Sequence, residues 1–187
     1  MIKPNDKGTT FLYDSKRAKK NELIFDVMGE LDELSSRIGM LCSLLSSYEE
    51  QVSILRRIQC VIQDIITDVK MDNKDARLVK NENVEEIEEA IDILEKTNPK
   101  ITRSILHGVT MADSQVHICR TQTRKAERYV WKLHNSTGLI TIFSNNTESV
   151  LPLSTIRIDI NITTYLNRLS DFFSVLSKWI CFYTQNV

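Results

Sequence analysis

The chain has 187 residues, of which 42% are hydrophobic and 26% charged, and its formal net charge is −1. This length and composition fit one soluble globular domain over residues 1–187. The near-neutral charge argues against a nucleic-acid binder, which is usually basic, and no apolar run is long enough for a membrane span. The four cysteines are widely spaced and form no CxxC pair, so we expect buried free thiols.

Residues 1–20 are polar and irregular in pattern and rich in Lys and Arg, which is typical of a disordered tail or of an anion-binding segment. Beyond them, apolar residues recur every three or four positions in five stretches. This spacing predicts amphipathic helices at 23–45, 54–69, 84–94, 111–133 and 165–180. With few Gly and Pro residues and short links, the prediction is an all-α fold, a five-helix bundle.

Residues 134–164, between the fourth and fifth predicted helices, do not have a helical pattern. The segment 139–143 is apolar and β-branched, and Ile156, Ile158, Ile160 and Ile162 alternate with polar residues, which is the period of a strand. Two structures fit this segment: a small β-hairpin, or a long irregular loop packed on the bundle.

The segment HICRTQTRKAER, residues 117–128, carries a basic stripe. Arg120, Arg124, Glu127 and Arg128 fall on one face of a helix, and we call these four residues the arginine stripe. Because guanidinium groups bind phosphate or carboxylate through two hydrogen bonds, the stripe indicates an anionic ligand. The alternative is a solvated surface with an internal Glu–Arg pair. The three His residues have no metal-ligand spacing, so no protein metal site is predicted.

Four blocks of the sequence, in order and nearly end to end, resemble one family. The blocks are 6–10 (DKGTT), 29–36 (GELDELSS), 117–128 (HICRTQTRKAER) and 165–171 (YLNRLSD). Together they resemble the ATP:cob(I)alamin (corrinoid) adenosyltransferases of the propanediol-utilisation type. The RKAER and YLNRLSD parts are the most specific.

This resemblance implies a five-helix bundle that assembles as a homotrimer, with an active site at each subunit interface. Family enzymes transfer the 5′-deoxyadenosyl group of ATP to the cobalt of cob(I)alamin and release triphosphate, so the implied ligands are ATP, Mg²⁺ and cobalamin. Cobalt(I) attacks the ribose C5′ directly, and the protein acts by positioning and electrostatics.

The resemblance also assigns residue roles. Asp32 and Arg124 would pair across the subunit interface and, with Arg128 on the phosphates, form the catalytic set. The implied ATP-binding residues are Lys3, Asp6, Gly8, Thr9, Thr10, Lys20, Glu127, Arg128 and Asn167. The residues alone leave alternatives open: the Asp32–Arg124 pair serves assembly only, and Asn167 only caps or links helices.

The expected corrin side departs from the family. Two phenylalanines that would wall the corrin are replaced by Ser104 and Ser174. Each buried aromatic side chain contributes roughly 150–250 Å² of apolar contact. At about 25 cal/mol per Å², its replacement by serine weakens the binding free energy of the corrin by several kcal/mol. Two functions follow: an active corrinoid adenosyltransferase with an unusual corrin pocket, or an inactive trimeric relative that binds ATP or a protein partner through 134–164. The N-terminus has no secretory pattern, so we expect a cytoplasmic protein.

Overall fold

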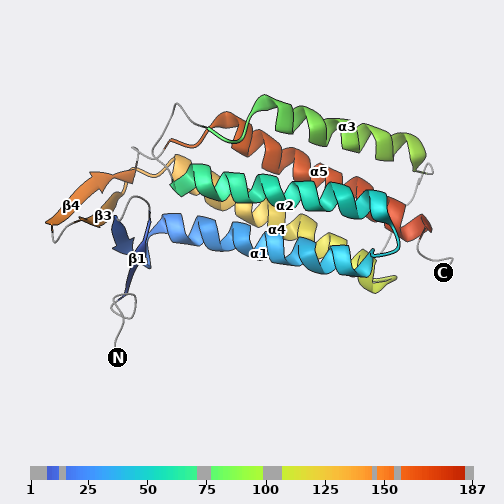
Figure 1. The fold of residues 1–187 in the computed structure, drawn as a ribbon, viewed down its shortest axis with the longest axis horizontal. Coiled ribbons are helices and arrows are strands. Elements are labelled where there is room, and N and C mark those ends of the chain that lie inside the picture. Colours follow the sequence, from blue (N-terminus) through green and yellow to red (C-terminus); the bar gives the residue numbers. More distant parts are fainter. Residues whose placement is uncertain are drawn as a thin grey trace.

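The computed structural model describes residues 8–12, 16–70, 77–98, 107–144, 147–153 and 157–183. Within these residues five helices dominate the fold (Figure 1): α1 (Leu23–Leu44), α2 (Glu49–Lys70), α3 (Asn81–Thr97), α4 (Met111–His134) and α5 (Ile160–Tyr183). Four short strands accompany them: β1 (Thr9–Phe11), β2 (Arg17–Lys19), β3 (Leu139–Ser144) and β4 (Thr147–Pro152). The predicted helical bundle is confirmed.

Burial follows the apolar spacing of the sequence. The side chains of α1 that are buried recur every three or four positions: Ile24, Val27, Leu31, Leu34, Ile38 and Leu41. The same rule holds on α5, where Tyr165, Phe172 and Phe173 are among the largest fully buried side chains. Burial of such a side chain stabilises the fold by about 1.5–3 kcal/mol, so packing holds the helices together. No helix among the described residues is long and apolar enough to cross a membrane.

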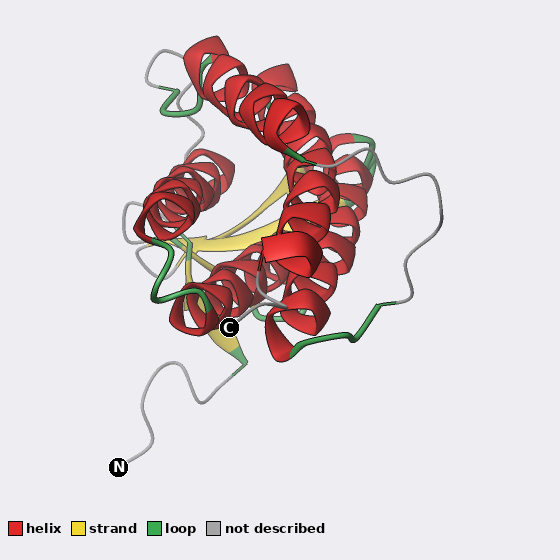
Figure 2. Ribbon diagram, turned by 90° about the vertical axis from the view of Figure 1, so that its right-hand side faces the viewer, coloured by secondary structure: helices red, strands yellow, loops and turns green. Residues whose placement is uncertain are grey.

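The helices lie around the bundle in the order α2–α1–α4–α5–α3. The main interfaces join α1 to α2 and α4, and α5 to α4 and α3. The ring of helices is therefore open between α2 and α3, as the end-on view shows (Figure 2).

Buried carboxylates fix two helix ends. Asp68, near the end of α2, accepts hydrogen bonds from the backbone N–H groups of Leu78 and Val79, which lead into α3. At the start of α4 the Thr110 hydroxyl accepts from the Asp113 N–H at 3.0 Å. The buried Asp113 carboxylate in turn accepts from the Gly108 N–H at 2.6 Å, so the loop that precedes α4 is tied to its first turn.

The strands form one antiparallel sheet, in the order β1–β2–β3–β4. This sheet lies at the end of the bundle where α4 ends and where α1 and α5 begin (Figure 1). Strand β2 pairs with β3 in the register Arg17↔Phe143 and Ala18↔Ile142. The β3–β4 pair confirms the hairpin form of the 134–164 segment.

Three predictions were wrong. The described part of residues 1–20 is not irregular, because β1 and β2 form a hairpin there. Ile160 and Ile162 do not alternate in a strand but lie in α5, with Ile162 buried and Ile160 66% exposed. Finally, Cys60 is exposed rather than buried, although all four cysteines are free thiols as expected.

Candidate active site

The arginine stripe runs from the middle of α4 toward the C-terminal end of the helix. Arg124 and Arg128 are exposed, while Arg120 and Glu127 are half-buried. The Arg128 Nη1 donates to the backbone oxygen of Arg124 at 3.0 Å, which leaves most of its five N–H donors for an external anion. Within the described residues, Glu127 forms no ion pair with an arginine of the stripe. The internal Glu–Arg pair of the alternative interpretation is therefore not formed.

The YLNRLSD block joins α5 to two neighbouring helices. The Asn167 Nδ2 lies 3.5 Å from the Glu127 Oε1 on α4 and donates to it. The next residue, Arg168, forms an ion pair of 2.7 Å with Glu88 on α3. Asn167 thus lies beside the arginine stripe, on a face of α5 that contacts α4.

A polar contact that the sequence reading missed holds α4 against α1. The Glu30 carboxylate lies 2.7 Å from the Lys125 Nζ, and it accepts a hydrogen bond of 2.8 Å from the Gln122 Nε2. The hydrogen bond to Glu30 raises the pKa of Lys125. The signal in the sequence was Gln122 itself, an amide at a buried position of α4. Glu30 therefore links α4 to the part of α1 that carries Asp32.

The N-terminal hairpin, β1 and β2, presents the glycine- and threonine-rich segment. Gly8 has a φ of 74°, in the left-handed region that favours glycine. Its carbonyl oxygen accepts from the Lys20 N–H at 2.9 Å. The Arg17 guanidinium donates to the Thr9 hydroxyl at 3.0 Å and to the Thr9 carbonyl at 3.1 Å, and it lies over the Phe11 ring. These contacts give Gly8 and the start of β1 a defined position.

Strand β3 braces this hairpin from the other side. Because β2 lies between β1 and β3, the N-terminal hairpin is held in the sheet by its pairing with β3. Ala18 is fully buried, and its register partner Ile142 is only 4% exposed. The Glu22 side chain, just before α1, accepts from the Thr141 N–H at 3.3 Å. The sequence suggested that 134–164 is an independent insertion. In the structure, β3 of this segment instead supports the N-terminal hairpin.

Asp32 and Arg124 are both exposed, on α1 and α4. Among the described residues neither forms an ion pair within the chain. Both charged groups are therefore exposed to solvent, on helices that pack against each other.

Ser174 lies on the exposed face of α5, two turns after Asn167. It lines a shallow cavity of about 520 Å³ with Glu88 and Asp92 of α3 and with Arg168 and Lys178 of α5. Most of the side chains that line this cavity are polar or charged. The remaining predicted residues, Lys3, Asp6 and Ser104, lie outside the described residues.

The described part of the chain contains no group of three His, Cys, Asp or Glu side chains arranged to hold a metal ion. Two histidine rings do lie close together near the start of α4: the centroids of His107 and His117 are 3.4 Å apart, and their planes are inclined by 37°. The His117 Nε2 lies 3.3 Å from the Asp113 Oδ1. Burial, followed by the charge of His107, lowers the pKa of His117.

The N-terminal hairpin, the starts of α1 and α5 and the arginine stripe all lie toward one end of the bundle (Figure 1). The class of protein is therefore an open helical bundle of five helices. Its guanidinium groups gather toward one end, where they can bind a polyanionic ligand. The family model described as cobalamin adenosyltransferase matches residues 1–180. The chain belongs to the cobalamin adenosyltransferase family.

Individual relatives agree. The corrinoid adenosyltransferase of Bacillus subtilis (strain 168) is 33% identical over 181 residues, which cover 94% of this chain and 83% of that protein. The corrinoid adenosyltransferase MMAB of Bos taurus is 30% identical over 185 residues, 95% of this chain and 69% of the relative. A solved structure is also similar, a variant of the PduO-type ATP:corrinoid adenosyltransferase from Lactobacillus reuteri complexed with cobalamin and ATP. It has 27% identity and a TM-score of 0.81, covering 99% of this chain and 94% of that one.

Proposed function

We propose that this protein transfers the 5′-deoxyadenosyl group of ATP to cob(I)alamin and releases triphosphate. The observation that carries the proposal is the contact between Asn167 and Glu127, which joins the YLNRLSD block to the arginine stripe. Two blocks that are far apart in the sequence thereby form one polar surface. The exposed guanidinium groups of Arg124 and Arg128 supply its positive charge.

In the reaction a bond forms between cobalt and the ribose C5′ while the C5′–O bond to the triphosphate breaks. Cobalt is formally oxidised from I to III, and the triphosphate leaves with the bonding electron pair. Negative charge therefore grows on the triphosphate, where Arg128 donates charge-assisted hydrogen bonds. The backbone N–H groups of Gly8, Thr9 and Thr10 and the hydroxyl groups of the two threonines are the proposed partners of the phosphates in the N-terminal hairpin. The resemblance assigns Lys3, Asp6 and Lys20 to the same ligand.

Mg²⁺ in this proposal arrives bound to the triphosphate. Mg²⁺ keeps several water ligands and binds readily to substrate phosphates without an all-protein cage.

The proposed assembly is a homotrimer in which Asp32 of one subunit pairs with Arg124 of the next. Their exposure and their lack of ion pairs within the described chain support this arrangement. The free thiols of Cys42, Cys60, Cys119 and Cys181 support a reducing compartment, and we propose the cytoplasm.

The corrin would lie toward Ser174, two turns along α5 from Asn167. The relative from Lactobacillus reuteri, complexed with cobalamin and ATP, is a variant in which one phenylalanine is replaced by alanine. That protein holds both ligands without one aromatic side chain. This supports an enzyme with a weakened corrin wall over an inactive relative that only binds ATP or a protein partner.

The test is to mix the purified protein with ATP-Mg²⁺ and cob(I)alamin kept reduced in the cuvette, and to follow adenosylcobalamin by its absorption spectrum. We expect one triphosphate for each adenosylcobalamin formed. ATP binding without a change in the corrin spectrum, or release of diphosphate and phosphate only, would contradict the proposed reaction. Cob(II)alamin with ATP then tests whether the site prepares the base-off corrin.

A further inference from the structure

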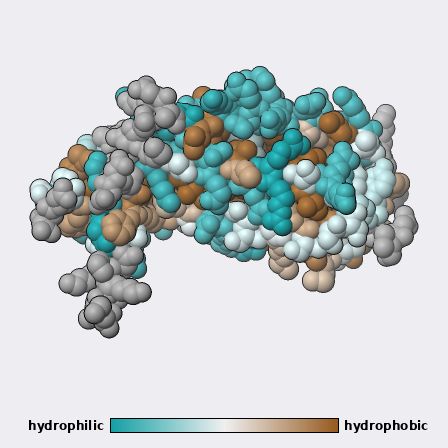
Figure 3. Space-filling model, in the orientation of Figure 1, coloured by the Kyte–Doolittle hydropathy of each residue, from teal (hydrophilic) through white to brown (hydrophobic). Residues whose placement is uncertain are grey.

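The opening between α2 and α3 is a groove with α5 at its floor, which we call the α2–α3 groove. Its cavity measures about 640 Å³, within the range of small-molecule sites. Its walls are mainly apolar: Ile54, Ile58, Val61, Ile87, Leu94 and Trp179. In Figure 3, hydrophobic residues show below the hydrophilic edge that α3 forms. The groove lies on the side of α5 that faces α3, and the arginine stripe lies on α4.

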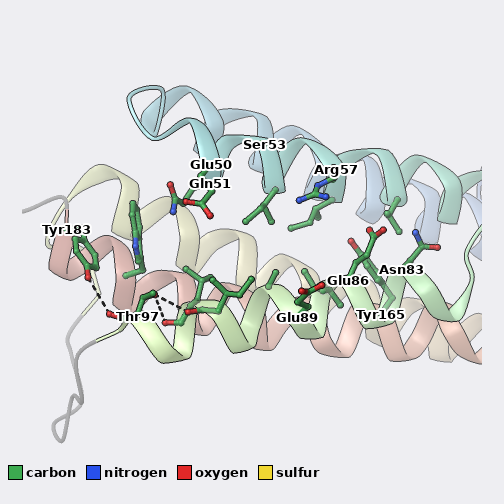
Figure 4. Close-up of a pocket in the computed structure, with 18 residues that line it drawn as sticks. Glu50, Gln51, Ser53, Arg57, Asn83, Glu86, Glu89, Thr97, Tyr165 and Tyr183 are labelled. Carbon is green, nitrogen blue, oxygen red and sulfur yellow. Dashed lines mark hydrogen bonds between the residues drawn. The ribbon is translucent and has the colours of Figure 1, made fainter.

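A buried polar group points to a ligand in this groove. Tyr165 of α5 lines the cavity and is only 2% exposed (Figure 4). Among the described residues its hydroxyl has no hydrogen-bond partner. Burial, followed by the charge of Glu86, raises the pKa of Tyr165, so the hydroxyl stays neutral. The hydroxyl is not among the fully enclosed polar atoms of the described residues, so it is open to the groove and can pair with a polar atom of a ligand there.

The charges on the rim are mostly negative. Glu50 of α2 and Glu86 and Glu89 of α3 line the groove, against one cation, Arg57 (Figure 4). Near Glu50, Trp179 and Tyr183 stack with centroids 5.2 Å apart and interplanar angle 28°. Aromatic faces beside carboxylates attract organic cations and repel anions.

The groove is long as well as apolar. Its α2 wall extends from Glu50 to Val61, which at 1.5 Å per residue is roughly 17 Å. We propose that the α2–α3 groove binds an elongated apolar molecule with a cationic end group, at a site separate from the ATP site. The apolar part lies along the α2 and α3 walls, the cation lies among the rim carboxylates, and a polar atom meets the Tyr165 hydroxyl.

The test uses the fluorescence of Trp179 in a Trp131→Phe background, which leaves it as the only tryptophan. The probes are decyltrimethylammonium and decanoate, equal in chain length and opposite in charge, both below their micelle-forming concentrations. We expect saturable binding of the cation, about tenfold tighter than that of decanoate. Equal or tighter binding of decanoate would overturn the proposed ligand class.

Two variant pairs locate the site. Glu86→Gln with Glu89→Gln should remove most of the charge preference, whereas the matched pair Glu82→Gln with Glu85→Gln, which changes the same charge on α3 outside the groove, should keep it. Ala90→Trp fills the groove and should abolish binding, with circular dichroism confirming the fold. Unchanged binding in a folded Ala90→Trp protein would overturn the proposal. Absence of saturable binding to the parent protein would also overturn the proposal. A helix of another protein would then be the remaining candidate for the groove.

Discussion

Replacement of Arg128 by alanine should weaken ATP binding without affecting the fold. The side chain is exposed, and its one hydrogen bond within the described chain is to the Arg124 backbone oxygen on the same helix. Loss of this contact should change the free energy of unfolding by less than about 0.5 kcal/mol. A charge-assisted hydrogen bond to phosphate is worth about 1.5–3 kcal/mol, so the Kd for ATP should rise roughly 10- to 150-fold.

Calorimetric titration with ATP-Mg²⁺ measures this change directly. Arg128→Lys should lie between the parent and the alanine variant, because lysine keeps the charge but loses the planar fork. Arg56→Ala is the matched control, an exposed arginine on α2 whose guanidinium contacts Gln59. An unchanged Kd in Arg128→Ala, with Arg56→Ala equally unchanged, would refute the phosphate role of the arginine stripe.

Three further predictions concern assembly, pH and the sheet. Asp32→Arg combined with Arg124→Asp should preserve the trimer in size-exclusion chromatography better than either single change, and equal loss in all three would argue against the pairing. The pKa of His117 lies below its ordinary 6.5, so the unfolded chain binds the proton first. As pH falls from 6.5 to the lowered pKa, the Tm should fall, and less so in His117→Gln; identical slopes would contradict this. Ile142→Ala removes a side chain only 4% exposed, which typically costs 2–5 kcal/mol. It should raise the KM for ATP several-fold with helicity unchanged, and an unaltered KM would remove the bracing role of β3.

The helices were predictable because each buries one face, and a buried face repeats every three or four residues. The same rule explains the error at the start of α5. Ile158 lies just before α5, and within the helix Ile160 is exposed and Ile162 is buried, so isoleucines at every second position do not mark the two faces of a strand here. Four residues are too few to separate the two periods.

The strands β1 and β2 could not be read from local sequence. Each has three residues, and β2 gains its second neighbour from β3, which lies far along the sequence, after α4. Similarly, the Glu30 contact with Gln122 and Lys125 depends on how α1 packs against α4, which neither segment reveals alone. The residues of the proposed site were identified through motifs, whereas their supporting contacts required the fold.

The position of β2 also bears on how the protein is made. Its two neighbours in the sheet, β1 and β3, come from segments far apart in the sequence, and pairings between distant segments form slowly in folding. A nascent chain that has not yet produced β3 lacks the brace for its N-terminal hairpin, however early that hairpin leaves the ribosome. We therefore expect nucleotide affinity to appear only when synthesis is nearly complete, so that unfinished chains do not sequester ATP.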